Sequence, residues 1–72
     1  MNTLNRMNAL KATAANVNAM PEQDRIELAN HLLAKYSHRM IPSLRDRVES
    51  MAYGFKVEHV LIGLLEDVGI EI

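Results

Sequence analysis

The sequence predicts an all-α protein, a compact bundle of about four short helices. Apolar residues recur at steps of three and four through most of the 72-residue chain, which is the repeat of one face of an α-helix. No segment shows the alternation of a half-buried strand. Prolines and glycines fall at the breaks between the periodic segments, at Pro21, Pro42, Gly54 and Gly69, where helices begin and end. Residues 1–72 are therefore expected to form a single helical domain.

The first two helices are predicted over residues 3–19 and 21–38. The first has a mild apolar stripe, which consists of Leu4, Met7, Leu10, Ala14 and Val17. In the second, Pro21 suits the first helical position, and Glu22 and Asp24 place negative charge at the positive end of the helix dipole. Its apolar face consists of Ile26, Ala29, Leu32, Leu33 and Tyr36.

The third helix is predicted over residues 43–53, where Ser43 and Asp46 have the spacing of a capping box. Gly54 is expected to end it in the left-handed conformation, with Phe55 folded back against the last turn. The fourth helix is predicted over residues 56–68 and is the most apolar, so we expect it at the centre of the bundle. Its apolar positions are Val57, Val60, Leu61, Leu64, Leu65 and Val68.

The composition favours a protein that self-associates. Hydrophobic residues make up 49% of the chain and the formal net charge is −1, so a domain this small is expected to keep apolar surface for a contact between copies. Ile62 lies off the apolar face of its helix, and Gly63 leaves a flat spot that another backbone could approach. We therefore predict a homo-oligomer, a dimer first, with Ile62 and Gly63 in the contact.

The sequence predicts neither a signal peptide nor a membrane span. The longest near-continuous apolar run, residues 60–65, is far shorter than the ~20 residues that a span requires. The chain has no cysteine, which fits a reducing compartment. The expected location is the cytoplasm, or the host cytoplasm if a phage encodes the chain.

The segment from residue 35 to residue 47 is the main candidate for binding a partner. It carries four cations and one acid, and Tyr36 could stack beside them; the cations are Lys35, Arg39, Arg45 and Arg47. Such a cluster could bind an acidic protein surface or phosphate. A solvated corner of the molecule is the alternative interpretation.

The third and fourth helices also have the spacing of a helix-turn-helix. Ser50 and Val60 supply the small residue and the apolar residue that this motif places before and after the glycine of its turn. The second helix, however, offers Glu58, Glu66 and Asp67, and acids would face DNA phosphates. An ordinary helical hairpin is the alternative, and nucleic acid is a less favoured partner than a protein.

No metal, cofactor or catalytic site is predicted. Glu27 and His31 are four residues apart, but no two histidines have the spacing that places two metal ligands on one helical face. There is no phosphate-binding glycine loop and no serine in a nucleophile elbow. The leading hypothesis is a non-enzymatic, self-associating module that occupies a partner protein's surface, as an inhibitor or regulatory adaptor. The alternative is a small DNA-binding regulator that uses residues 35–47 or the helical hairpin.

Overall fold

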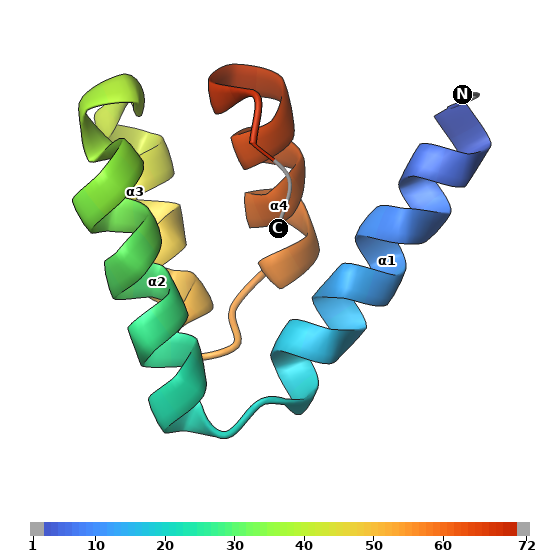
Figure 1. Cartoon of the computed structure of the whole chain (residues 1–72), viewed down its shortest axis with the longest axis horizontal. Helices are drawn as coiled ribbons and strands as arrows, with labels where there is room; N and C mark the ends of the chain where they lie inside the picture. Colours follow the sequence, from blue (N-terminus) through green and yellow to red (C-terminus); the bar gives the residue numbers. More distant parts are fainter. Residues whose placement is uncertain (1–2, 71–72) are drawn as a thin grey trace.

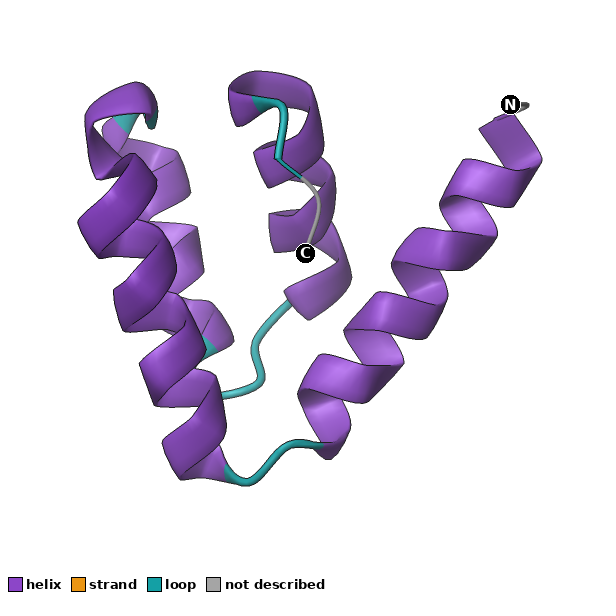
Figure 2. Cartoon of the chain, viewed as in Figure 1, coloured by secondary structure: helices purple, strands orange, loops and turns teal. Residues whose placement is uncertain are grey.

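The computed structural model of the chain describes residues 3–70, with side chains from residue 7 onward. Over this range the protein is all-α and contains no strand, which confirms the predicted fold class (Figure 1, Figure 2). The helices are α1 (Thr3–Ala19), α2 (Glu22–Tyr36), α3 (Pro42–Met51) and α4 (Val57–Gly63). A 3₁₀ turn, η1 (Ser37–Arg39), follows α2, and a π-helical turn, η2 (Leu64–Val68), continues α4.

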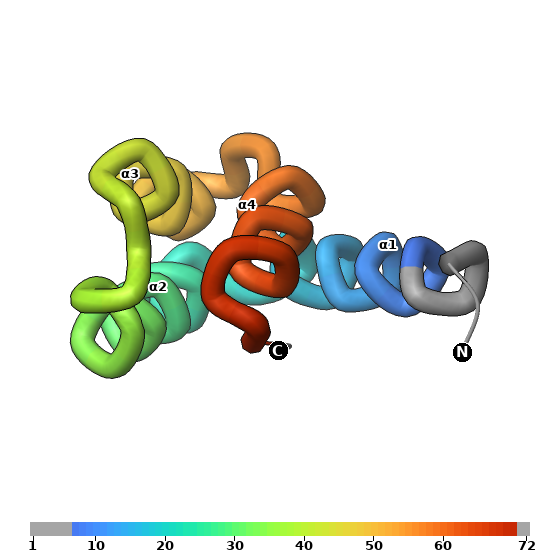
Figure 3. Tube along the Cα trace, turned by 90° about the horizontal axis from the view of Figure 1, so that it is seen from above, coloured from blue at the N-terminus to red at the C-terminus, as the bar shows by residue number. Residues whose placement is uncertain are grey.

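The helices form a flat bundle of 31 × 27 × 16 Å. α2 packs against α3, and α4 lies between α3 and α1 (Figure 1, Figure 3). The N-terminal half of α1 diverges from the other helices, as Figure 1 shows. The C-terminal half of α1 therefore makes its contact with the bundle, through the buried side chains of Ala14 and Val17.

The most apolar segment lies at the centre, as its pattern predicts. Val60 and Leu64 are fully buried, and Val57, Leu61 and Val68 are nearly so. The side chains that surround them come from every other helix; they are Ala14, Val17, Ala29, Leu32, Met40, Leu44, Val48, Met51 and Ala52. This core is aliphatic and sulfur-containing, because the only aromatic side chain packed against it is the half-buried Tyr36.

α3 ends in a Schellman motif around Gly54. Gly54 has φ +82°, which confirms its predicted left-handed conformation. The Gly54 N–H donates to the Met51 carbonyl at 2.9 Å and the Phe55 N–H donates to the Ser50 carbonyl at 3.3 Å, the bond pair that defines this motif. Gly69, with φ +79°, closes η2 in the same conformation.

The predicted capping box at the start of α3 is wrong. The N-cap is Ile41, in an extended conformation, and no side chain caps the helix. A residue before proline avoids the helical region and proline suits the first helical position, so Pro42 begins the helix and Ser43 already lies inside its first turn. α2 differs in the opposite direction, because Pro21 is its N-cap and Glu22 its first residue.

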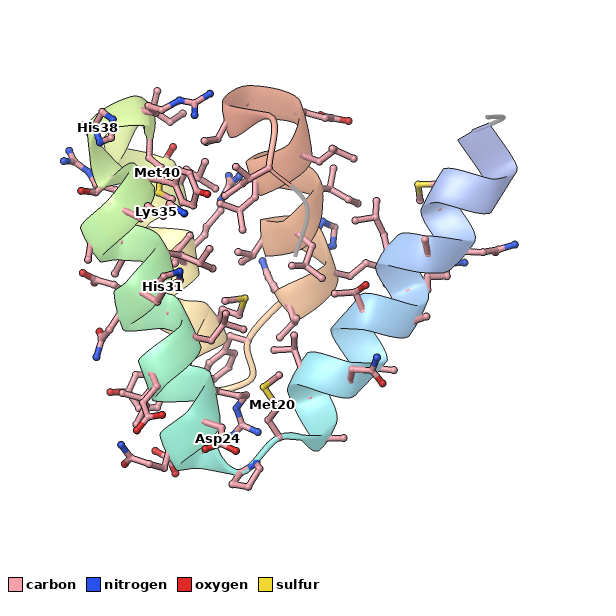
Figure 4. The ribbon with its side chains drawn as sticks, in the orientation of Figure 1. Met20, Asp24, His31, Lys35, His38 and Met40 are labelled. Carbon is pink, nitrogen blue, oxygen red and sulfur yellow. The ribbon has the colours of Figure 1, made fainter. Side chains whose placement is uncertain are left out.

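Two arginines join segments that are distant in the sequence. From α2, Arg25 donates through Nε to the Ala52 carbonyl at 3.2 Å and through Nη1 to the Met20 carbonyl at 2.6 Å. Met20 lies at the junction of α1 and α2 (Figure 4). From η1, Arg39 donates through Nη2 to the Val68 carbonyl at 2.7 Å. Each guanidinium therefore satisfies carbonyls at helix C-termini, which lack partners within their own helix and carry partial negative charge.

Candidate partner-binding surface

The basic residues of segment 35–47 do not share one face of the molecule. Arg45 and Arg47 are both exposed on α3, but two residues along a helix correspond to about 200° of rotation, so they point to opposite flanks. Arg47 lines a hollow with residues of α4, and Arg45 does not. Arg39 is engaged with the Val68 carbonyl. The four predicted cations thus form no single patch.

Lys35 and Tyr36 make a local contact at the end of α2. The Lys35 Nζ lies 5.4 Å from the centroid of the Tyr36 ring, within the range of a cation–π interaction. Tyr36 is half-buried against the core. Lys35 is exposed and lies near Met40 in the view of Figure 4. Tyr36 is therefore largely a packing residue whose ring is flanked by Lys35, and it has less free surface for stacking than the sequence suggested.

The turn after α3 displays two aromatic side chains. Tyr53 is 63% exposed and Phe55 is 66% exposed, and they are two of the three aromatic residues in the chain. Ile41, 58% exposed at the start of α3, is the only other large hydrophobic residue exposed to this degree within the described side chains. We name residues 53–56 the aromatic turn.

The Schellman motif explains why Phe55 stays exposed, against the prediction that it folds back. In this motif the residue after the left-handed glycine packs on the residue five positions before it, when that residue is apolar. Here that residue is Ser50, whose hydroxyl donates to the Asp46 carbonyl at 3.1 Å, and the residue before it is Glu49. Phe55 has no apolar partner in its own turn.

The Phe55 side of the aromatic turn opens onto a groove between α3 and α4. Two adjoining hollows, each of about 310 Å³, share Arg47 and Lys56. The first also has Ser50, Phe55 and Val60 in its wall. The second continues along α4 and η2, past His59, Ile62, Gly63, Glu66 and Asp67. We name the two hollows together the α3–α4 groove.

Lys56 occupies a position that normally favours glycine. Its φ is +50° and its ψ is +42°, the left-handed helical region, and it is the only non-glycine residue with positive φ in residues 3–70. A side chain in this region costs roughly 1–2 kcal/mol. The chain therefore places a lysine where glycine would be less strained, and this lysine lines both hollows of the groove.

The Tyr53 side of the aromatic turn faces a separate hollow of about 240 Å³ between α2 and α3. Two of its lining residues, Asn30 and Glu49, are polar or charged; the other lining residues are Ile26, Ala29, Leu33, Ala52 and Tyr53. The two aromatic side chains thus lie on opposite flanks of the end of α3, and each stands beside a concave surface.

The predicted self-association residues, Ile62 and Gly63, both line the α3–α4 groove. A Cβ at Gly63 would lie 3.0 Å from the Leu44 Cδ1, so the flat spot at Gly63 accommodates a side chain of α3 in the same chain. Ile62 is half-buried. The structure therefore places both residues on one concave surface, and their part in self-association stays a prediction.

The outward face of the second helix of the predicted helix-turn-helix carries acids and no lysine or arginine. In α4 and η2 it carries Glu58, His59, Glu66 and Asp67, and α4 itself is only seven residues long. His31 and His38 lie on α2 and η1 (Figure 4), and His59 lies in the groove. Among the described residues, no three His, Asp or Glu side chains come close enough to hold a metal ion.

Comparison with known proteins adds no family to this geometry, because no protein-family model, curated protein or solved structure matches the chain. Within residues 3–70, none of the helices has both the length and the apolar character needed to cross a bilayer.

Sequence reasoning missed Tyr53, Phe55 and Lys56 as surface residues. The signal for Phe55 was present, because Ser50 and Glu49 are the positions against which a Schellman motif would pack it. The apolar periodicity of the sequence does not indicate the strained backbone of Lys56. That strain arises because two left-handed residues, Gly54 and Lys56, reverse the chain within three positions.

Proposed function

We propose that this chain is a small, non-enzymatic protein-binding module that occupies the surface of a partner protein with its aromatic turn. An inhibitor or a regulatory adaptor acts in this way. The observation that carries the proposal is the exposure of Tyr53 and Phe55, two of the chain's three aromatic residues, on one turn.

Burial of either aromatic side chain within the fold would stabilise the protein by about 1.5–3 kcal/mol. The chain instead builds its core from aliphatic residues and methionine and leaves both rings in water. Aromatic side chains and arginine dominate the energetics of protein interfaces. An aromatic ring brings a large apolar area with few rotatable bonds. Arg47 and Lys56, beside Phe55, add charges that would orient a partner.

The test begins with a photo-crosslinking residue at position 53 or 55, in cells that express the chain. Once a crosslinked protein is identified, its dissociation constant is measured with purified components, for the wild type and for Tyr53→Ala and Phe55→Ala. We expect at least one substitution to raise the dissociation constant by about tenfold or more. Lys11→Ala, at an exposed position on α1, is the matched control and should leave it unchanged.

Both substitutions remove side chains that are about two-thirds exposed, so circular dichroism and the melting temperature should stay close to the wild type. Crosslinks that form to nucleic acid and to no protein would favour the alternative of a DNA-binding regulator. A protein partner whose affinity is unchanged in both variants would refute the proposed role of the aromatic turn.

A further inference from the structure

The α3–α4 groove carries cations and acids at its two ends. Arg47 and Lys56 lie at the end next to the aromatic turn, and Glu66 and Asp67 lie in η2 at the other end. From the start of α4 to η2, the residues Lys56, His59, Gly63 and Glu66 all line the same hollow. The groove is thus one continuous strip with opposite charges at its ends.

A strip of this kind is complementary to itself. In a dimer with two-fold symmetry the same patch is used on both copies, and if residue i of one copy contacts residue j of the other, the reverse contact also forms. When the two strips run antiparallel, the cationic end of each copy lies on the acidic end of the other. We propose that the α3–α4 groove is a two-fold interface whose occupant is a second copy of this chain.

The spacing along α4 defines the register. Across α4 and η2, Lys56 and Asp67 are 11 residues apart in the sequence, and the midpoint between them falls beside Ile62. A two-fold axis at that point places Lys56 opposite the second copy's Asp67 at both ends of the interface. It also brings Ile62 of the two copies together at the centre, so the half-buried Ile62 would lose its remaining contact with water.

The same register gives Phe55 a position. It places the Phe55 ring opposite residues 68–70 of the second copy, where the half-buried Ile70 packs against the core. Apart from its two chain neighbours, no described atom lies within 4 Å of a Cβ built on Gly69, so the surface beside this residue is open to an aromatic ring. Phe55, which lacks an apolar partner in its own turn, would find one in the other copy.

This inference deepens the proposed function, because it names the partner of the Phe55 side and leaves the Tyr53 side free in the dimer. The proposed binding of another protein and the proposed dimer can fail independently. Tyr53→Ala tests the binding of another protein by a dimer that stays intact, and charge reversal in the groove tests the dimer without changing Tyr53.

The decisive experiment is a charge exchange, measured by sedimentation equilibrium and light scattering at micromolar concentrations. One variant carries Arg47→Glu with Lys56→Glu, and the other carries Glu66→Lys with Asp67→Lys. In each variant alone, both ends of the interface would have like charges, and we expect the dimer dissociation constant to rise on the order of a hundredfold. An equimolar mixture pairs an all-acidic groove with an all-basic groove, and we expect it to recover a heterodimer.

Matched controls reverse the same charges outside the groove. Lys11→Glu with Arg45→Glu, and Glu27→Lys with Asp46→Lys, change exposed residues that line neither hollow of the groove and should leave the dimer intact. A monomeric wild type, a groove variant that dimerises as well as the wild type, or a mixture that stays monomeric would each overturn the proposal. All four groove positions are exposed, and if a double variant loses its helical circular dichroism, the single reversals Lys56→Glu and Asp67→Lys repeat the same exchange.

Discussion

Removal of the Arg25 guanidinium should destabilise the fold strongly, although this side chain is only half-buried. Arg25→Ala deletes the bonds to the Ala52 and Met20 carbonyls and a longer bond of 3.4 Å to the Asn18 carbonyl. A hydrogen bond to a charged group contributes about 1.5–3 kcal/mol when it is buried. Because Arg25 is half-buried and the third bond is long and exposed, we expect the two short bonds to contribute about 1–1.5 kcal/mol each, or roughly 2–3 kcal/mol together.

That loss is a large part of the stability of a chain this small, for which about 5 kcal/mol is typical at the low end. It should lower the melting temperature by about 10–20 °C, as measured by circular dichroism, and it should lower the free energy of unfolding in urea by the same 2–3 kcal/mol.

Arg25→Met keeps the apolar stem, which separates lost packing from lost hydrogen bonds. Arg25→Lys keeps the charge but has one donor group in place of the planar fork, so we expect an intermediate stability. Arg45→Ala is the exposed control, and a loss below about 0.5 kcal/mol in Arg25→Ala would refute the reasoning.

Three further predictions follow from the turn, the core and the cations. Gly54→Ala should destabilise the protein by about 1 kcal/mol, because φ is +82° at this position. Lys56→Gly should stabilise it by roughly 0.5–1 kcal/mol, because glycine relieves the left-handed strain and the added entropy of the unfolded chain costs less than that strain. Urea denaturation measures both changes in the free energy of unfolding, and changes of the opposite sign would mean that the turn is misplaced. Val60→Asp places an unpaired charge at a position with 0% exposure and should remove the cooperative melting transition; a folded variant with an unchanged melting temperature would contradict the central position of α4. We expect no appreciable binding to duplex or single-stranded DNA at physiological salt, measured by fluorescence anisotropy at two salt concentrations; tight, salt-sensitive binding that is lost when Arg39, Arg45 and Arg47 are reversed would favour the DNA-binding alternative.

The sequence was sufficient for the parts of the fold that depend on local pattern. α1 has the predicted bounds, and α2 and α3 begin within one residue of their predicted starts. Apolar periodicity identified α4 as the centre because a helix that is apolar over much of its surface has few other places to lie. The left-handed Gly54 at the end of α3 followed from the conformational freedom of glycine, and Gly69 ends the last helix as predicted.

The same reasoning could not find the contacts that cross the fold. The bond from Arg25 to Ala52 joins residues 27 positions apart, and no periodic pattern reports which carbonyl a flexible side chain will reach. The basic segment is a different case, since the helical repeat already separates Arg45 from Arg47. A count of charges along the sequence grouped residues that the helix places on opposite flanks.

The aromatic turn is the place where local preferences and the observed structure conflict, and that conflict supports a role in binding. A fold that served only its own stability would have an apolar residue in place of Ser50 to cover Phe55, and a glycine in place of Lys56 to relieve its strain. Both changes are single substitutions, and each would stabilise the isolated chain. Positions where a chain forgoes accessible stability are concentrated at functional sites. The two positions adjoin the same groove, so their combined cost is most simply explained by a surface that is completed when a second molecule covers it.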